Sequence, residues 1–438
     1  MKRMALLNMM NAIRMNQARE KPGMRNHRIS RVKALLAMIL LIVLLFPMRL
    51  DHGWLFFSTI SILDLTLSAI FLVTLVTYLL CGKIAIGEHK IFAVLSLPVI
   101  FSVFSMLWSV NLTETLKSIV VYGAALATFL ITATLFREFS AQSLARLFLI
   151  IPIMLISTAL LSYVPSSPIQ PEAVMPSLAI AQDGFLLSYK ARFSHPFLGL
   201  SNSFATILAM LLPLVVLVRK LGFWPRRSWW IAIITFSAII STGSRGVIAS
   251  VLLGYCFSFL GRLNLTGRLR LPRKTFFSLI AAMIFATGFV FLNPNAQKHL
   301  MDRLSVVNIV SRLNAFIEVF ALLDENPTGI GSGVSLSDVS GLSLRSVHNA
   351  YLQNFLWFGL IGGTLTTLLM WALPLFVLGM RMRSVHGLAA KRGLAMSVLM
   401  LLLINMSQAS WEGSVIRLWI YFLIAVGVIM VRKADSLQ

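Results

Sequence analysis

Three polar side chains in this apolar chain have the clearest potential for chemistry: Arg245, Arg312 and His348. An arginine binds phosphate through a planar, permanently charged fork, and a neutral histidine can accept a proton near neutral pH. Taken singly, Arg245 fits equally well as a snorkelling arginine at a turn. Arg312 also fits an interfacial arginine paired with a lipid phosphate or Glu318. His348 also fits a helix-capping or solvated residue, so single residues leave the chemistry open.

The motifs of several enzyme and carrier classes are absent from the sequence. There is no Gly-x-x-x-x-Gly-Lys-Ser/Thr phosphate loop, so ATP-driven transport by this chain alone is not expected. No His-Glu-x-x-His or Gly-x-Ser-x-Gly motif supports a metalloprotease or a serine hydrolase. No Asp-x-Asp pair offers the metal site of many nucleotide-sugar transferases. Cys81 and Cys256 give neither a disulfide framework nor metal-ligand spacing.

The composition defines the class of protein that must hold these residues. Hydrophobic residues make up 58% of the 438 positions and charged residues 12%, whereas soluble domains are roughly 45–50% apolar and about 25% charged. So few charges could not cover the surface of a soluble fold. The composition therefore predicts an all-α polytopic membrane protein, and it gives no indication of a nucleic-acid partner despite the net charge of +23.

Twelve segments are candidates to cross the bilayer, since a helix needs about 20 mostly apolar residues to span about 30 Å of hydrocarbon. They are roughly 34–49, 62–81, 91–108, 115–136, 144–164, 199–218, 228–242, 246–261, 275–292, 351–379, 393–410 and 415–431. The seventh and eighth are short and are split by Gly243-Ser244-Arg245-Gly246, and the tenth is long enough to bend near Pro374.

These spans divide the chain into four parts. Residues 1–33 form a basic cytoplasmic extension, and 34–292 form a transmembrane region of nine spans. A large helical periplasmic loop follows at 293–350. Residues 351–438 supply the last three spans and a short cytoplasmic tail.

The distribution of basic residues predicts the orientation of the chain. With both termini inside, the cytoplasmic segments contain 28 of the 38 Lys and Arg residues and only 4 of the 15 acidic residues. Short loops rich in Lys and Arg remain on the cytoplasmic side. The opposite orientation would place nearly all of this charge on the wrong side, so we expect both termini in the cytoplasm.

The large outer loop contains an amphipathic pattern. Apolar residues at 313, 316, 317, 320 and 323 follow helical spacing, with Arg312, Asn314 and Glu318 set off that stripe. We expect a helix on or near the outer membrane surface. Asn326-Pro327-Thr328-Gly329-Ile330-Gly331-Ser332-Gly333 then ends the helix and forms a loop.

Several motifs together resemble the O-antigen ligase and Wzy-type polymerase superfamily of bacterial membrane glycosyltransferases. They are Trp108-Ser109-Val110-Asn111, Ser244-Arg245-Gly246, Arg312 with the following Asn326–Gly333 segment, His348-Asn349-Ala350-Tyr351-Leu352, and Phe358-Gly359-Leu360-Ile361-Gly362. These motifs run from about 108 to 363, and the rest of the chain is similar only in hydropathy. His-Asn-x-Tyr-Leu after Pro-x-Gly-x-Gly is the most specific part.

The resemblance implies a reaction and a set of site residues. Such proteins transfer a glycan from undecaprenyl diphosphate to an acceptor hydroxyl on the periplasmic side of the bacterial inner membrane, without a metal or cofactor. It implies that His348 is the general base and that Arg245 and Arg312 bind the substrate diphosphate. Arg303, Arg345, Asn349 and Tyr351 are possible additional site residues. The implied partners are the lipid-linked glycan donor, a lipid A–core or glycan acceptor, and the bilayer.

Three functions remain open at this stage. The first is an O-antigen ligase with lipid A–core as the acceptor, and the second is an O-antigen or exopolysaccharide polymerase with the same chemistry. A polysaccharide flippase or secondary transporter is the third, since twelve spans with both ends inside are common among transporters. The acceptor is not encoded in the motifs, so the sequence separates ligase from polymerase poorly.

Overall fold

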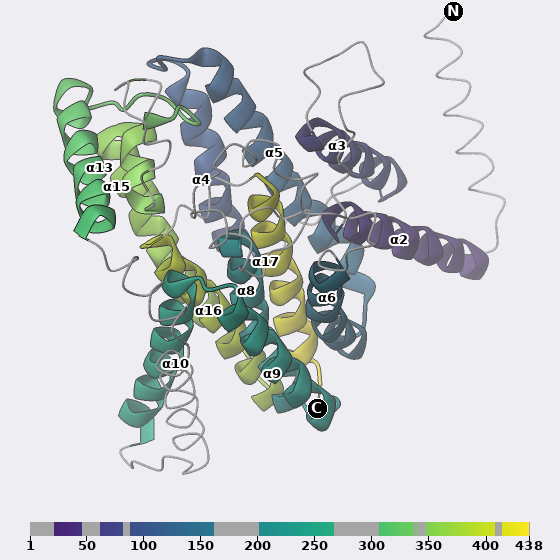
Figure 1. Cartoon of the computed structure of the whole chain (residues 1–438). Helices are drawn as coiled ribbons and strands as arrows, with labels where there is room; N and C mark the ends of the chain where they lie inside the picture. The colour runs from purple at the N-terminus through teal and green to yellow at the C-terminus, as the bar shows by residue number, and fades with distance from the viewer. Residues whose placement is uncertain are drawn as a thin grey trace, which may run out of the picture.

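The computed structural model describes residues 22–45, 62–81, 88–161, 201–266, 306–336, 339, 347, 349–407 and 414–437. Every regular element within these ranges is a helix (Figure 1). The helices are α2 (Pro22–Leu45), α3 (Ile62–Cys81), α4 (His89–Ser105), α5 (Leu112–Leu135), α6 (Ala141–Leu161), α8 (Ser201–Lys220), α9 (Pro225–Ser241), α10 (Arg245–Thr266), α13 (Val306–Glu325), α15 (Ala350–Leu378), α16 (Val385–Asn405) and α17 (Ser414–Asp435), with a short 3₁₀ turn, η1, at Phe136–Glu138.

The helices coincide with the predicted spans wherever the structure describes them. The predicted span 275–292 lies outside the described residues, and each other predicted span overlaps one helix. By length and composition, six helices of the described part could cross a membrane, namely α5 (continuing through η1), α6, α8, α15, α16 and α17. The all-helical membrane class is therefore confirmed, while the number of about twelve spans stays a prediction.

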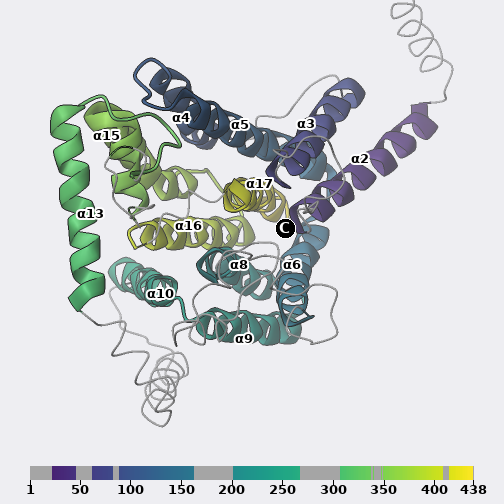
Figure 2. The same cartoon turned by 45° about the horizontal axis from the view of Figure 1, so that its top comes forward.

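The centre of the bundle is α17, which Figures 1 and 2 show enclosed by α5, α6, α8 and α16. Every residue from 416 to 431 is buried. Two of its aromatic side chains donate hydrogen bonds to neighbouring helices: Trp419 Nε1 to the Leu44 carbonyl at 3.1 Å, and Tyr421 Oη to the Leu95 carbonyl at 2.7 Å. Lipid chains are as apolar as the helix faces, so the hydrophobic effect does not select which faces pack together. Interhelical hydrogen bonds of this kind help to position the helices instead.

Several buried hydroxyl groups inside the helices bond to a carbonyl of their own helix. Thr128 donates to the Ala124 carbonyl, Thr206 to the Asn202 carbonyl and Thr235 to the Ile231 carbonyl, all at 2.7–2.8 Å. A hydroxyl without a partner is costly in an apolar medium. Bonding back by one turn lets Ser and Thr stay in the spans without interrupting them.

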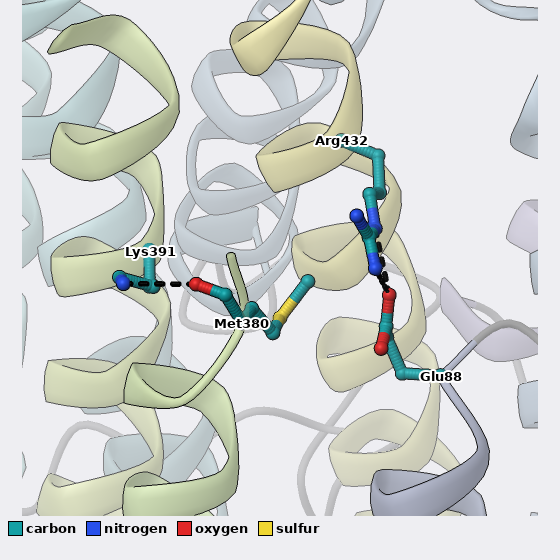
Figure 3. Close-up of polar contacts among 4 residues, drawn as sticks. All are labelled: Glu88, Met380, Lys391 and Arg432. Atoms are coloured by element: carbon teal, nitrogen blue, oxygen red, sulfur yellow. Dashed lines mark hydrogen bonds and ion pairs between the residues drawn. The ribbon is translucent and has the colours of Figure 1, made fainter. Parts of the chain in front are cut away.

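Segments that the charge pattern assigns to the cytoplasm meet at one end of the bundle. Arg432, near the end of α17, pairs with Glu88 just before α4, and Lys391 of α16 donates to the Met380 carbonyl at 2.9 Å (Figure 3). Lys33 of α2 pairs with Glu138 of η1. These contacts are consistent with a shared side for the segments, and the assignment of that side to the cytoplasm stays a prediction.

The predicted amphipathic helix is present as α13, but the stripe divides between two environments. Leu313, Ile317 and Phe320 are exposed, at 54%, 58% and 61%. A different face of the helix is buried, and it belongs to a small apolar cluster separate from the main core. This outer cluster consists of Ala315, Val319, Leu322, Leu323, Ile330, Val334, Leu336, Val347, Leu352 and Leu356. The helix thus packs on α15 with one face and exposes a second apolar face.

Candidate active site

The segment that follows His348 is fixed firmly to the end of α16. Asn349 is the N-cap of α15, and its Oδ1 accepts hydrogen bonds from the backbone N–H groups of Tyr351 (2.9 Å) and Leu352 (3.1 Å). Its Nδ2 donates to the Met406 carbonyl at 3.0 Å. Tyr351 Oη donates to the Leu402 carbonyl at 2.7 Å. Both residues therefore have structural partners, which hold the start of α15 against α16.

Helix α15 is a hairpin of two arms rather than a single rod. In a straight helix, Tyr351 and Trp371 would lie about 30 Å apart, yet their ring centroids are 5.7 Å apart. Asn354 Nδ2 also lies 3.7 Å from the Met370 sulfur. The chain reverses at Gly359, where φ is 70° and ψ is −169°. Residues 350–358 form a short arm, and 360–378 form the arm long enough to cross a bilayer.

The reversal depends on a residue without a side chain. Because φ is positive at Gly359, an L-residue would be strained there. A Cβ atom would also collide with the backbone of Pro327 and Thr328. The sequence placed a possible bend near Pro374, but the sharp break in the structure is at Gly359. This break turns a predicted long span into a half-helix followed by a shorter span.

The glycine-rich loop after α13 inserts between this hairpin and the junction of α4 and α5. The Ile330 N–H donates to the Leu356 carbonyl at 2.9 Å, and the Ile330 carbonyl accepts from the Val110 N–H at 3.1 Å. The Leu360 N–H donates to the Pro327 carbonyl at 2.9 Å. Three motifs far apart in the sequence therefore contact one another: 108–111, 326–333 and 358–362. We call this contact region the motif joint.

A buried group of serine hydroxyls completes the joint. Ser332 Oγ lies 2.8 Å from Ser102 Oγ on α4 and 2.6 Å from Ser118 Oγ on α5, and the Ser332 N–H donates to Ser105 Oγ at 3.1 Å. All four serines are buried. Small residues allow this close approach, and the hydroxyl pairs satisfy one another in an apolar setting. The close packing of these segments thus accounts for the small residues in the Pro-x-Gly-x-Gly and Phe-Gly motifs.

The predicted site residues are only partly described. Arg245 is the exposed first residue of α10 and follows a tight turn in which Gly243 has φ 63°. Arg312 belongs to α13, and its side chain is outside the described part of the chain. His348, Arg303 and Arg345 also lie outside it, although His348 immediately precedes Asn349.

The elements that carry these candidates nevertheless gather on one side of the molecule. Figure 2 shows α16 between α10 and α15, with α13 along the outer edge of α15. Arg245 begins α10, Arg312 lies within α13, and His348 comes directly before α15. The fold therefore brings together helices that carry residues separated by about a hundred positions in the sequence.

Sequence reasoning missed two buried polar residues close to these elements. Arg417 is only 4% exposed, and its guanidinium lies 4.1 Å from the ring centre of Tyr122 and 5.8 Å from that of Trp357. Trp357 in turn donates from Nε1 to the Val334 carbonyl at 2.8 Å. This buried cation therefore links α17 and α5 to the glycine-rich loop. An arginine inside the predicted span 415–431 was the available signal, because charges within spans are rare.

The second buried polar residue that the sequence did not reveal is Asn405, the last residue of α16. It is completely buried, and among the described residues neither its Oδ1 nor its Nδ2 has a hydrogen-bond partner. The next residue, Met406, accepts the hydrogen bond from Asn349. An unsatisfied buried amide is unusual in proteins. No sequence pattern distinguishes Asn405 from a satisfied asparagine.

Within the described ranges, no group of three or more His, Cys, Asp and Glu residues is arranged to hold a metal ion. Metal independence stays a prediction.

The fold and the motif joint define a helical integral membrane protein. Within this class, residues 230–367 match the family described as O-antigen ligase. The match extends from α9 into the long arm of α15 and contains Arg245, Arg312 and His348. It confirms the resemblance to the O-antigen ligase and polymerase superfamily, and with it a ligase- or polymerase-type function in general. No curated protein matches the chain.

Proposed function

We propose that this protein transfers a glycan from undecaprenyl diphosphate to an acceptor hydroxyl at the outer face of the inner membrane, as an O-antigen ligase with lipid A–core as its acceptor. The observation that carries the proposal is the family match at 230–367, which includes all three predicted site residues. The grouping of α10, α13 and α15 beside the end of α16 supports it.

Arginines suit the leaving group of this reaction. When the bond between the anomeric carbon and the diphosphate oxygen breaks, negative charge grows on the diphosphate. A planar guanidinium can bind two phosphate oxygens at once, and this contact strengthens as the charge develops. Arg245 at the exposed start of α10 and Arg312 in α13 are assigned this role. Because the departing diphosphate is already a stable anion, a general acid is not required.

The acceptor needs a base rather than an acid. Its hydroxyl oxygen forms the new bond to the anomeric carbon and gives up its proton as it attacks. A neutral histidine can take that proton near neutral pH, and His348 is assigned this role. The hydrogen bonds of Asn349 and Tyr351 to α16 hold the following residues in place, so we assign these two residues to positioning the segment rather than to the reaction itself.

The function is tested by the glycans of a strain that lacks this chain. A ligase predicts unmodified lipid A–core together with long carrier-linked glycans, and a plasmid copy of the wild-type chain should restore the modified lipid A–core. Accumulation of single repeat units on the carrier would instead assign a polymerase. Normal amounts of every surface glycan would reject both enzymes and favour transport or another role.

A further inference from the structure

The end of the bundle near the C-terminus carries a cluster of cations and indole rings that the glycan reaction does not use. This basic surface consists of Arg146 on α6, Arg219 and Lys220 at the end of α8, and Arg226 and Arg227 at the start of α9, with Trp224, Trp229 and Trp230. All five cations are exposed. The sequence contains no acidic residue between Asp183 and Asp302, so neither α8 nor α9 contributes a compensating charge.

The indole rings hold two of these cations in place. The guanidinium of Arg146 lies 5.2 Å from the ring centre of Trp224, and that of Arg219 lies 5.1 Å from the ring centre of Trp229. The N–H donors of a guanidinium lie in its own plane, so a cation held over an indole ring can still donate to a phosphate. Because the ring already restricts the side chain, less side-chain freedom is lost on binding.

The turn that presents Trp224 is strained. Among the described residues, Trp224 is the one non-glycine residue with a positive φ, 42°. A bulky residue rarely adopts this conformation unless its surroundings hold it there. Here the Ser228 hydroxyl donates to the Trp224 carbonyl at 3.0 Å, and the Phe223 ring packs 6.0 Å from the Trp224 ring. The strained turn places the Trp224 ring beside Arg146, which comes from another helix.

The apolar residues next to the basic surface indicate that its ligand is a lipid. Trp229 and Trp230 are 46% and 65% exposed, and the next turn of α9 exposes Ile233 and Ile234. In a membrane protein, an exposed apolar helix face contacts acyl chains, and tryptophans mark the level of the headgroups. The cations therefore lie where lipid phosphates lie, rather than on a surface directed into the aqueous phase.

We propose that the basic surface is a binding site for the phosphate headgroup of an anionic phospholipid. Arg146 and Arg219, held by their indole rings, contact the phosphate, while Arg226 and Arg227 add attraction from the start of α9. Basic clusters between helices at the cytoplasmic side bind anionic lipids in this way.

The test compares two pairs of charge-removing substitutions in the purified full chain. Arg226→Gln with Arg227→Gln removes two cations of the basic surface that do not stack on the rings described above. Arg381→Gln with Arg383→Gln removes two exposed cations between α15 and α16 and serves as the matched control. Native mass spectrometry measures the retained lipid, and thermal unfolding measures stabilisation by added phosphatidylglycerol or phosphatidylcholine.

We expect phosphatidylglycerol to stabilise the wild-type chain more than phosphatidylcholine does. The 226/227 variant should bind phosphatidylglycerol about 30-fold more weakly, since each cation near an anionic surface contributes about fivefold. The 381/383 control should retain wild-type binding. Equal stabilisation by both lipids would overturn the proposal, and so would an equal loss in the control, because general surface charge would then explain the binding.

Discussion

At the scale of single residues, two asparagines show how the surroundings decide the effect of a polar group: Asn349, the N-cap of α15, and Asn405, the last residue of α16. Asn349 uses both ends of its amide, accepting from two backbone N–H groups of α15 and donating to Met406. Asn405, one residue before Met406, is buried with neither amide atom bonded within the described residues. The same side chain is therefore stabilising at one position and costly at the other.

We expect Asn405→Leu to raise the free energy of unfolding by about 1–3 kcal/mol. The buried amide carries a desolvation penalty that no hydrogen bond compensates, and leucine removes that penalty. Asn349→Ala should lower the free energy of unfolding by about 1 kcal/mol or more, because a helix cap is lost. Thermal unfolding of the purified variants in detergent measures both. A destabilised Asn405→Leu variant would show that its amide has a bonding partner in the folded protein.

The assigned general base gives a second prediction at this scale. His348→Ala should reduce glycan transfer by about 100-fold or more, as expected for the loss of proton transfer in the transition state. His386→Ala, near the start of α16 at the opposite end of that helix, is the matched control and should retain activity. Transfer is measured with carrier-linked glycan and purified acceptor. Full activity of a folded His348→Ala protein would eliminate the role.

At the scale of elements, the hairpin of α15 shows why the glycine motifs belong together. At the reversal, the backbone of Pro327 and Thr328 packs directly against Gly359 and leaves no room for a Cβ atom there. In the same loop, a Cβ atom at Gly329 would lie 2.7 Å from the Trp357 carbonyl oxygen. Each segment thus excludes side chains from the other, and both glycines have positive φ values. The loop and the hairpin must therefore form as one unit.

Gly359→Ala should destabilise the protein by more than about 2 kcal/mol, since the positive φ alone costs an L-residue about 1–2 kcal/mol and the collision with the loop adds to it. Gly123→Ala is the control, because α5 has open space at that position and alanine favours a helix. Thermal unfolding should show a clear loss for the first variant and no loss for the second. Equal stabilities would mean that the joint can be rearranged easily.

At the scale of the whole molecule, two sets of polar contacts lie at opposite ends of the helices. One set joins Glu88 to Arg432 and Met380 to Lys391 (Figure 3). The other joins Val110 to Ile330 and Asn349 to Met406. This division agrees with the alternation predicted from basic residues, because a chain crossing a bilayer repeatedly places successive loops on alternate sides.

Cysteine labelling in cells tests the orientation. In a background with Cys81 and Cys256 replaced by Ala, Asn326→Cys should react with a membrane-impermeant maleimide in intact cells. Ser436→Cys should react only after the inner membrane is opened. Both parent residues are exposed, so accessibility reflects the side of the membrane. The reverse pattern would invert the proposed topology and place the candidate site in the cytoplasm.

The sequence alone predicted the membrane class, the approximate helix positions and the resemblance to the superfamily. Apolar run length and short motifs are local properties, so α4, α8 and α17 could be located without knowledge of their neighbours. The sequence predicted the site residues Arg245, Arg312 and His348, with Asn349 and Tyr351 as possible members, but not the carbonyl partners of Asn349 and Tyr351 at the end of α16. Their hydrogen bonds could not be predicted, because they join positions about fifty residues apart.

Only the tertiary structure decided which apolar surfaces pack together. In a membrane protein, lipid and protein interior are both apolar, so hydropathy does not distinguish the buried Val319 from the exposed Ile317 on α13. The same limit concealed the hairpin at Gly359 and the burial of Arg417 between Tyr122 and Trp357. These features arise from contacts between distant segments, whereas the spans follow from the solubility of each segment in lipid.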